Sequence, residues 1–508
     1  MPRKLQLERV SPEVPATEFF AKYVSKRTPV IITGLLDDPS FRGRKWMNLD
    51  YLAKKAGDVE VMVEPIHPTA NQYGTDVERI SMTFRDFLNS LRKDEGPHPY
   101  LTTQYSDEDP DAETVFPPPT NALKDEFPIV PRIIGNLFLQ HVNLWLGKSK
   151  SGSSSGLHHD FHDNIYCLLK GKKRFVLFPP QEVKHLYPYG TLDTLHPNGL
   201  ISYEDIPVRS DGLSRRAACK ARVRALERKI DALKSKESGK GKGKGKGHSK
   251  EMKALMDAHD AALDELAELA LDEDQGEGEV DDFDALMGGL DDFDDLDAGT
   301  SGHTDEDDDE DSNEEGDEEE EWKGIGHSDD EDKASDEGDE KSDDEEEEEE
   351  ASLGGEEPAH TEPSSFSRIP TAHLHRYLGI PTTAALPRSF SPSEFPGLKK
   401  TTDPYVVELS EGEMLYLPAS WWHEVTSTSA AVDSAGGDDV HMAFNYWFYP
   451  PDALDDFETP YRDTLVWDYL RGKSDTENGK SPEAVKKGRT AKRARDDAIG
   501  GNSKKARR

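Results

Sequence analysis

The sequence predicts a mainly β fold that is interrupted once by a long insertion. Apolar runs of strand length gather in two parts of the chain, 136–209 and 363–450. The clearest of these runs are 165–169, 171–180, 405–409, 414–417, 422–425 and 441–449. The few strands expected between residues 158 and 423 need at most roughly 100 residues with their turns, but this part of the chain is much longer. Residues 210–362 are therefore expected to be an insertion.

The segments that flank the two β halves are expected to be partly helical. Residues 1–135 predict a mixed α/β shoulder, because apolar residues at helical spacing alternate with continuous apolar runs. The expected helices there cover 18–24, 46–56 and 81–91, and the expected strands cover 29–34, 59–63 and 99–103. Residues 187–208 show little regular pattern and are expected to be a loop. The segment 451–472 is expected to form a final amphipathic helix over 452–470. It is followed by a basic tail, 473–508, that is expected to be disordered.

The insertion begins with two segments of heptad spacing that carry opposite charge. The basic segment spaces Val223, Leu226, Ile230 and Leu233 in this way, and the acidic segment spaces Leu255, Ala262, Leu263, Leu266 and Leu269 similarly. A glycine and lysine repeat, 239–247, separates them, which predicts a helical hairpin with oppositely charged arms. Two short heptad segments are marginal alone, so two independently fraying helices are the alternative.

The charge of the chain is concentrated in two segments. The formal net charge is −41, and residues 281–350 hold 38 Asp and Glu against 3 Lys, which predicts a solvated, disordered tract. Its scattered apolar residues suggest docking on a basic partner of histone or ribosomal type, with a purely solubilising role as the alternative. Residues 486–508 hold 10 Lys and Arg and predict nuclear localisation. A nonspecific nucleic-acid contact or a solvated tail is the alternative.

Cysteine content and hydropathy indicate the cellular compartment of the protein. The chain has two cysteines, Cys167 and Cys219, too few for a disulfide framework, which predicts a reducing compartment. There is no apolar run of membrane length and no secretory segment near Met1. We therefore expect a soluble intracellular protein that is nuclear, with the cytoplasm as a second compartment, and that has no membrane partner.

A histidine and a carboxylate two residues apart begin a candidate metal site. His158 and Asp160 precede the apolar run 165–169, so they are expected on or entering a strand, where residues i and i+2 share a face. They supply two of the three ligands of a 2-His-1-carboxylate triad, which leaves coordination positions open on Fe(II). His423, at the start of the predicted strand 422–425, is the best candidate for the third ligand.

The same tripeptide spacing occurs at two further places. The segments 303–305 and 327–329 also read His-x-Asp, but both lie in the acidic tract and have no strand signal. The neighbouring His159 and His162 are out of phase with the first pair. They are expected at the rim of the site or on its substrate side.

A lysine near the candidate ligands predicts an anion site. Alternation along 171–180 places Lys173 on one face of a strand, together with Phe175 and Leu177. An unpaired buried ammonium is costly, so an inward lysine needs an anion, and a bound dicarboxylate would supply one. The alternative is a lysine at a strand end whose amine reaches water.

Motifs from both halves occur in a characteristic order. They are TPVIITGLL at 28–36, NLWLG at 143–147, LHHD at 157–160 with Asn164, GKKRFVLFPP at 171–180, GEMLYLPASWWHEV at 412–425 and AFNYW at 443–447. In this order they resemble the JmjC or cupin-type oxygenases that depend on Fe(II) and 2-oxoglutarate. The resemblance implies a double-stranded β-helix, or jelly roll, with flanking helices.

The resemblance also implies roles for individual residues. Fe(II) would be held by His158, Asp160 and His423, and O2 and 2-oxoglutarate would be the cosubstrates. Lys173 would bind the distal carboxylate of 2-oxoglutarate. The helper residues near the cosubstrate would be Ser155, Tyr100, Asn164 and Asn445. Oxidation of a substrate C–H bond would accompany decarboxylation of 2-oxoglutarate to succinate and CO2.

The substrate class is left open by the sequence. Small members of the resembled family that lack reader domains look like protein side-chain hydroxylases, which makes a protein substrate the first expectation. The basic tail and acidic tract keep histone lysine or arginine demethylation as an alternative, and nothing favours direct nucleic-acid binding. A non-catalytic acidic scaffold of histone-chaperone type, built on an inert cupin, is a third interpretation. Ligand type alone would also admit Zn(II).

Overall fold

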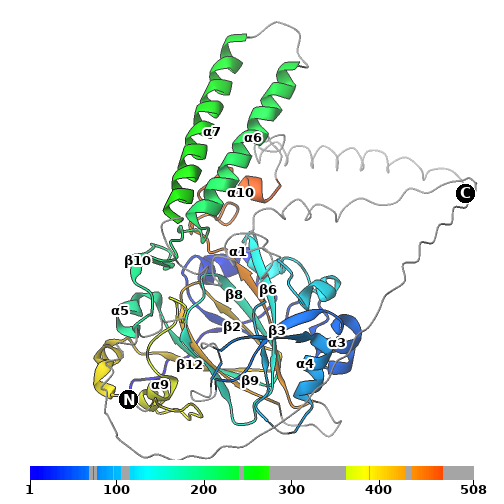
Figure 1. The fold of residues 1–508 in the computed structure, drawn as a ribbon, viewed down its shortest axis with the longest axis vertical. Helices are drawn as coiled ribbons and strands as arrows, with labels where there is room; N and C mark the ends of the chain where they lie inside the picture. Colours follow the sequence, from blue (N-terminus) through cyan, green and yellow to red (C-terminus); the bar gives the residue numbers. More distant parts are fainter. Residues whose placement is uncertain are drawn as a thin grey trace, which may run out of the picture. The chain divides into compact units, whose positions relative to one another are not determined.

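The computed structural model describes most of the two β halves and the first part of the insertion. The described residues are 1–67, 72–73, 77–94, 96–104, 115–238, 245–273, 362–387, 390–430 and 438–472 (Figure 1). The acidic tract 281–350, both further His-x-Asp segments and the basic tail 486–508 lie outside them. Within the described residues no helix has the length and apolar character needed to cross a membrane.

Two facing sheets form the β domain, and this confirms the predicted mainly β fold. The large sheet contains, in spatial order, β1 (Arg9–Val10), β2 (Val30–Ile32), β13 (Met414–Leu417), β8 (Asp163–Lys170), β15 (His441–Phe448), β6 (Leu139–Gly147), β5 (Tyr100–Leu101), β3 (Glu60–Glu64) and β4 (Ile80–Thr83). The small sheet contains β12 (Tyr405–Ser410), β9 (Lys172–Phe178), β14 (Trp422–Thr428) and β7 (Ser153–His158). Strands from the two chain halves alternate throughout the small sheet and across β13, β8, β15 and β6 of the large sheet.

Side-chain alternation along β9 explains how the sheets enclose an interior. Phe175 and Leu177 pack with Tyr166 and Leu168 of the large sheet in one buried cluster. The intervening residues of β9 point to the opposite side and join a second cluster with Trp422. This is the period-two pattern that the sequence predicts for 171–180. The interior between the sheets is therefore lined by one face of each strand.

The N-terminal residues belong to the large sheet and also cover its outer face. The covering helices are α1 (Ala16–Phe19), η1 (Phe20–Val24), α2 (Gly43–Trp46), α3 (Leu49–Ala56) and α4 (Phe84–Leu91), which contribute to the largest apolar cluster. The single helix predicted over 46–56 is divided at Asn48. The Asn48 side chain accepts hydrogen bonds from the backbone N–H groups of Asp50 and Tyr51, so it caps α3 and prevents a continuous helix.

Two long helices occupy the segment for which a helical hairpin is expected. α6 (Arg215–Ser238) and α7 (Gly245–Glu273) lie side by side (Figure 1). A small buried apolar cluster of Val223, Leu226 and Ala262 packs between them. The beginning of α6 does not stand apart from the β domain. Ala217 and Ala218 are buried in the main core, so this core extends into the predicted insertion.

The helix expected over 81–91 begins only at Phe84, because Ile80–Thr83 form β4. Two further local predictions are wrong. The residues expected to be a loop contain a β-hairpin of β10 (Leu192–Leu195) and β11 (Ile201–Tyr203), whose short strands lack a long apolar repeat. The helix expected over 452–470 is reduced to α10 (Thr464–Leu470). Pro460 precedes it, and proline disfavours a helical conformation in the residue before it. The Asp463 side chain then accepts from the Val466 N–H and caps α10.

Short helices connect the remaining strands. They are η2 (Thr120–Glu126), η3 (Arg132–Ile134), η4 (Pro180–Glu182), α5 (Val183–Leu186), α9 (Thr371–Leu378), η6 (Pro392–Glu394) and η7 (Pro396–Lys400). The sequence prediction did not include α9. It begins a few residues after the predicted insertion and packs near β7.

A buried ion pair anchors the turn before β14. Arg27 donates to both carboxylate oxygens of Asp163, at 2.6 and 2.5 Å, and Asp163 is fully buried. Asp163 also accepts from the Tyr416 hydroxyl at 2.7 Å and from the Ala419 N–H at 2.9 Å. The carboxylate therefore joins the N-terminal segment, β8 and the turn that leads to His423.

We expect Asp163→Asn to lower the free energy of unfolding by about 3 to 5 kcal/mol, because it leaves Arg27 buried without its counter-charge. Urea unfolding followed by circular dichroism measures this change. The matched control is Asp58→Asn, which removes an exposed pair with Arg85. Its expected cost is below about 1 kcal/mol. Equal effects of the two variants would contradict a structural role for the Asp163 pair.

Candidate metal and cosubstrate site

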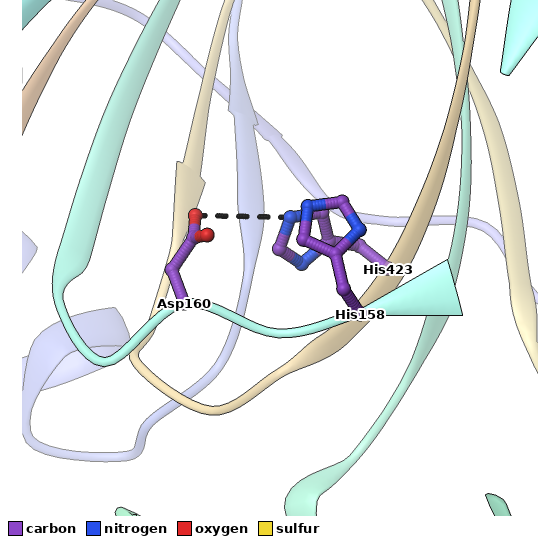
Figure 2. Close-up of side chains that lie close together, drawn as sticks. All are labelled: His158, Asp160 and His423. Atoms are coloured by element: carbon purple, nitrogen blue, oxygen red, sulfur yellow. Dashed lines mark ion pairs between the residues drawn. The ribbon is translucent and has the colours of Figure 1, made fainter. Parts of the chain in front are cut away.

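The structure brings the three predicted metal ligands together. His158 is the last residue of β7 and is paired in register with His423 of β14, and the two ring centroids are 4.3 Å apart. One ligand atom from each of His158, Asp160 and His423 lies within 4.8 Å of the others (Figure 2). Among the described residues, this is the one group of His, Cys, Asp or Glu with such spacing.

Asp160 reaches this group from a connection and not from a strand. β7 ends at His158 and β8 begins at Asp163, so the expected strand alternation of His158 and Asp160 is wrong. The backbone carbonyl of Asp160 accepts a hydrogen bond of 2.7 Å from the Ser420 N–H. This contact holds the connection against the turn before His423, and it places the carboxylate 3.7 Å from His423 Nε2.

Backbone contacts orient both imidazoles for metal binding. His158 Nδ1 lies 3.1 Å from the Gly156 carbonyl oxygen, and His423 Nδ1 lies 2.8 Å from the Trp421 carbonyl oxygen. A carbonyl can only accept, so each Nδ1 carries the hydrogen and each Nε2 keeps its lone pair. Burial lowers the pKa of His158 well below its ordinary value, which favours the neutral ligand form.

The environment of Asp160 combines opposing influences. Burial raises the pKa of its carboxyl group, while His423 and the side chains of Asn164 and Trp447 oppose that rise. The carboxylate is therefore poorly compensated by the protein alone. A bound cation would supply the missing stabilisation, so two neutral imidazoles and one carboxylate fit a divalent metal ion.

A pocket with about 600 Å³ of empty space, part of it open to solvent, connects this group with Lys173. Its walls come from both sheets. Eight of the seventeen lining residues are aromatic or aliphatic, and the other nine are polar, four of them serines. The residues that matter most for chemistry among its lining are His158, Asp160, His423, Lys173, Tyr100, Ser155, Asn164 and Ser427. The predicted metal ligands and the predicted anion-binding lysine thus share one cavity.

Lys173 is buried without a carboxylate partner among the described residues. It is 1% exposed, and its Nζ donates to Ser427 Oγ at 2.6 Å and to the Tyr100 hydroxyl at 3.2 Å. Burial alone lowers its pKa to about 7. Two neutral hydroxyl groups do not compensate an ammonium fully, so the protein provides a cation that lacks its anion.

Sequence reasoning missed Ser427 and His441 beside this lysine. Ser427 could have been found by alternation, because it lies four residues after His423 on the same strand. His441 is 1% exposed, its ring lies 5.4 Å from that of Tyr100, and the nearby charge of Lys173 contributes to its lowered pKa after burial. No sequence pattern distinguishes His441 from a core residue.

The other predicted helpers occupy different positions. Ser155 lines the cavity, and its Oγ accepts from the Val425 N–H at 3.3 Å. Asn164 also lines the cavity. Asn445 is fully buried outside the lining, and it donates to Asn164 Oδ1 at 3.0 Å and accepts from Trp145 Nε1 at 2.8 Å. Asn445 therefore orients two lining residues.

The expectation that His159 and His162 lie at the rim is wrong. Both are 1% exposed. His159 Nε2 lies 2.7 Å from the Tyr203 hydroxyl of β11, and His162 stacks on Trp447 of β15. The β10–β11 hairpin, which the sequence did not predict, is what covers His159.

A jelly roll that encloses a histidine and carboxylate group in its interior defines the cupin class of proteins. Residues 16–454 match the model of a family described as "Cupin-like domain", and the chain belongs to this family. It is 36% identical over 469 residues to JmjC domain-containing protein 4 of Schizosaccharomyces pombe, covering 89% of this chain and 86% of that protein.

More distant relatives have names that state activities. The chain is 31% identical over 172 residues to lysine-specific demethylase JMJ30 of Arabidopsis thaliana, covering 34% of this chain and 37% of that protein. It is 26% identical over 180 residues to the human bifunctional peptidase and (3S)-lysyl hydroxylase JMJD7, covering 34% and 53%. The JmjC family normally uses Fe(II) and 2-oxoglutarate, and its members are typically oxygenases.

Proposed function

We propose that this protein is an Fe(II)- and 2-oxoglutarate-dependent oxygenase that hydroxylates a side chain of a protein substrate. The observation that carries the proposal is Lys173. A buried ammonium without an anion shares a cavity with a histidine and carboxylate group that is suited to a divalent metal. A dicarboxylate that bridges metal and lysine would satisfy both.

The metal ligands and the other residues of the cavity would have different roles in the reaction. His158, Asp160 and His423 would hold Fe(II) and leave coordination positions for cosubstrates. The bound iron would supply the oxidative chemistry that couples decarboxylation of 2-oxoglutarate to oxidation of a C–H bond. Lys173, with Tyr100 and Ser427, would bind the distal carboxylate and fix the orientation of 2-oxoglutarate. The aromatic and aliphatic residues of the lining would help to exclude water from the site.

The overall reaction is balanced by the named cosubstrates. One oxygen atom of O2 enters the substrate C–H bond as a hydroxyl group. The other enters succinate as 2-oxoglutarate loses CO2. No further reductant is needed for this stoichiometry.

Anaerobic titration tests the proposal directly. Metal-free protein is titrated with Fe(II) and then 2-oxoglutarate, and the weak visible absorption band of an iron-bound 2-oxo acid is recorded. We expect the band with Fe(II), and none when Zn(II) replaces iron. The absence of a band at any concentration would overturn the proposal and favour an inert cupin or another metal.

A second candidate is demethylation of a methylated lysine or arginine, and the name of the Arabidopsis relative, a lysine-specific demethylase, supports the lysine case. The same oxidation at an N-methyl group releases formaldehyde, whereas side-chain hydroxylation does not. Formaldehyde formation with methylated histone peptides therefore separates the two candidates. Succinate formation without formaldehyde supports hydroxylation.

We also propose that the basic tail directs nuclear import. Removal of residues 486–508 eliminates 10 Lys and Arg, so a fluorescently tagged chain should move from the nucleus to the cytoplasm. Imaging of the tagged full chain and the truncated chain measures the change. The control replaces the ten basic residues by glutamine at constant length. A nuclear signal that persists in both variants would contradict the proposal.

A further inference from the structure

The chain returns from the insertion to the β domain through residues 364–367, which we call the return segment. It lies beside β7, which is the edge strand of the small sheet. The His159 N–H donates to the Ser365 carbonyl at 3.2 Å, and the Ser367 N–H donates to the Leu157 carbonyl at 2.8 Å. The return segment therefore acts as a short additional strand that covers an otherwise open edge.

The opposite side of the return segment is also fixed. The N–H groups of Tyr189 and Gly190 donate to the carbonyls of Phe366 and Ser364, at 2.9 and 3.1 Å. A Cβ at Gly190 would lie 2.3 Å from the Ser364 Cβ, so the close approach requires glycine. The Ser364 hydroxyl also donates to the Asp205 carboxylate. Contacts on both sides leave this segment little freedom.

The fixed backbone places Phe366 against a candidate metal ligand. The Phe366 ring stacks on the His158 imidazole with centroids 4.8 Å apart and an interplanar angle of 15°. The same two residues form an isolated antiparallel β-bridge. Because His158 Nδ1 also contacts the Gly156 carbonyl, the imidazole is held at one edge and on one face.

We propose that Phe366 is a positioning residue for the metal site, which holds His158 in the orientation that presents Nε2 to the metal. The inference rests on the proposed function only in requiring that the three ligands bind a metal ion. Residues that support metal ligands commonly affect affinity, since ring orientation must be set before the metal arrives. Here that support comes from the return segment, which follows the predicted insertion.

A second contact from the same stretch of chain reaches the other histidine strand. His375 of α9 lies 3.1 Å from a carboxylate oxygen of Glu424, which is fully buried and follows His423. Glu424 also accepts from the Ser154 hydroxyl of β7 at 2.6 Å. Residues 364–375 thus contact both strands that carry the histidine ligands.

The test measures metal binding to the full chain and does not depend on turnover. Metal-free protein is titrated with Co(II), and the visible absorption of bound Co(II) gives the affinity. We expect Phe366→Ala to weaken Co(II) binding by about 10-fold, and Phe366→Tyr to keep the wild-type affinity. Phe390→Ala is the matched control, because Phe390 is also partly buried but stacks on Phe395. It should leave Co(II) affinity unchanged.

A second variant separates positioning from general destabilisation. Phe366→Leu keeps apolar volume but lacks a flat ring, so it should bind Co(II) as weakly as Phe366→Ala while its metal-free thermal unfolding matches wild type. Wild-type affinity in both the Ala and Leu variants would overturn the inference and leave the proposed function standing. A Tyr variant as weak as the Ala variant would also overturn it. Failure of the wild-type chain to bind Co(II) would overturn both proposals.

Discussion

Asp160→Ala should reduce 2-oxoglutarate decarboxylation by more than about 100-fold while the metal-free fold is retained. Replacement of residues that only support ligands typically costs 10- to 100-fold in metal affinity or activity, so loss of a ligand should cost more. The variant removes a carboxyl group whose pKa is raised by burial, so its loss should not destabilise the metal-free protein. Succinate formation and thermal unfolding, each measured with and without Fe(II), test the two parts.

The chain contains its own control for this substitution. Asp305→Ala changes the same tripeptide pattern in the acidic tract and should leave succinate formation at the wild-type rate. Stabilisation of the wild type by Fe(II) should be absent in Asp160→Ala and present in Asp305→Ala. Full turnover by Asp160→Ala would place the metal elsewhere in the chain.

Lys173→Met should weaken 2-oxoglutarate binding by about 100-fold, which corresponds to about 3 kcal/mol for a buried carboxylate that loses its cation. The same change should leave the metal-free protein at least as stable as wild type, because it removes a buried ammonium without a carboxylate partner among the described residues. Titration of the iron complex with 2-oxoglutarate gives the affinity, and urea unfolding gives the stability. The exposed neighbour supplies the control, Lys172→Met, which should change neither.

The pKa of Lys173 also predicts a pH dependence. Burial lowers this pKa from 10.5 to about 7 in the folded protein. Between pH 7 and 10.5 the unfolded lysine binds a proton that the folded lysine lacks, so stability of the metal-free protein from this group rises with pH. Binding of 2-oxoglutarate requires the ammonium form, so its affinity should fall as pH rises above about 7. Lys173→Met should lose both dependences, and their persistence would assign them to another group.

The sequence predicted the structure correctly where a local residue pattern is compatible with only one arrangement. Alternation along β9 correctly placed Lys173 in the interior, because a strand side chain has only two faces to choose from. The position of Asp160 was misjudged, because its connection is held by a contact with Ser420, 260 residues away in the chain. The stack of Phe366 on His158 was invisible for the same reason. Contacts between distant segments leave no local periodicity.

The alternation of the two chain halves within the small sheet has a consequence for synthesis. β7 and β9 of the first half find their main partners in β14 and β12 of the second half. His423 is translated 265 residues after His158, which takes between about 10 and 50 s at typical rates of chain elongation. During that interval the small sheet has unpaired edges and the metal site lacks a ligand. A nascent chain of this protein is therefore exposed to aggregation, and to chaperones, for much longer than its domain size suggests.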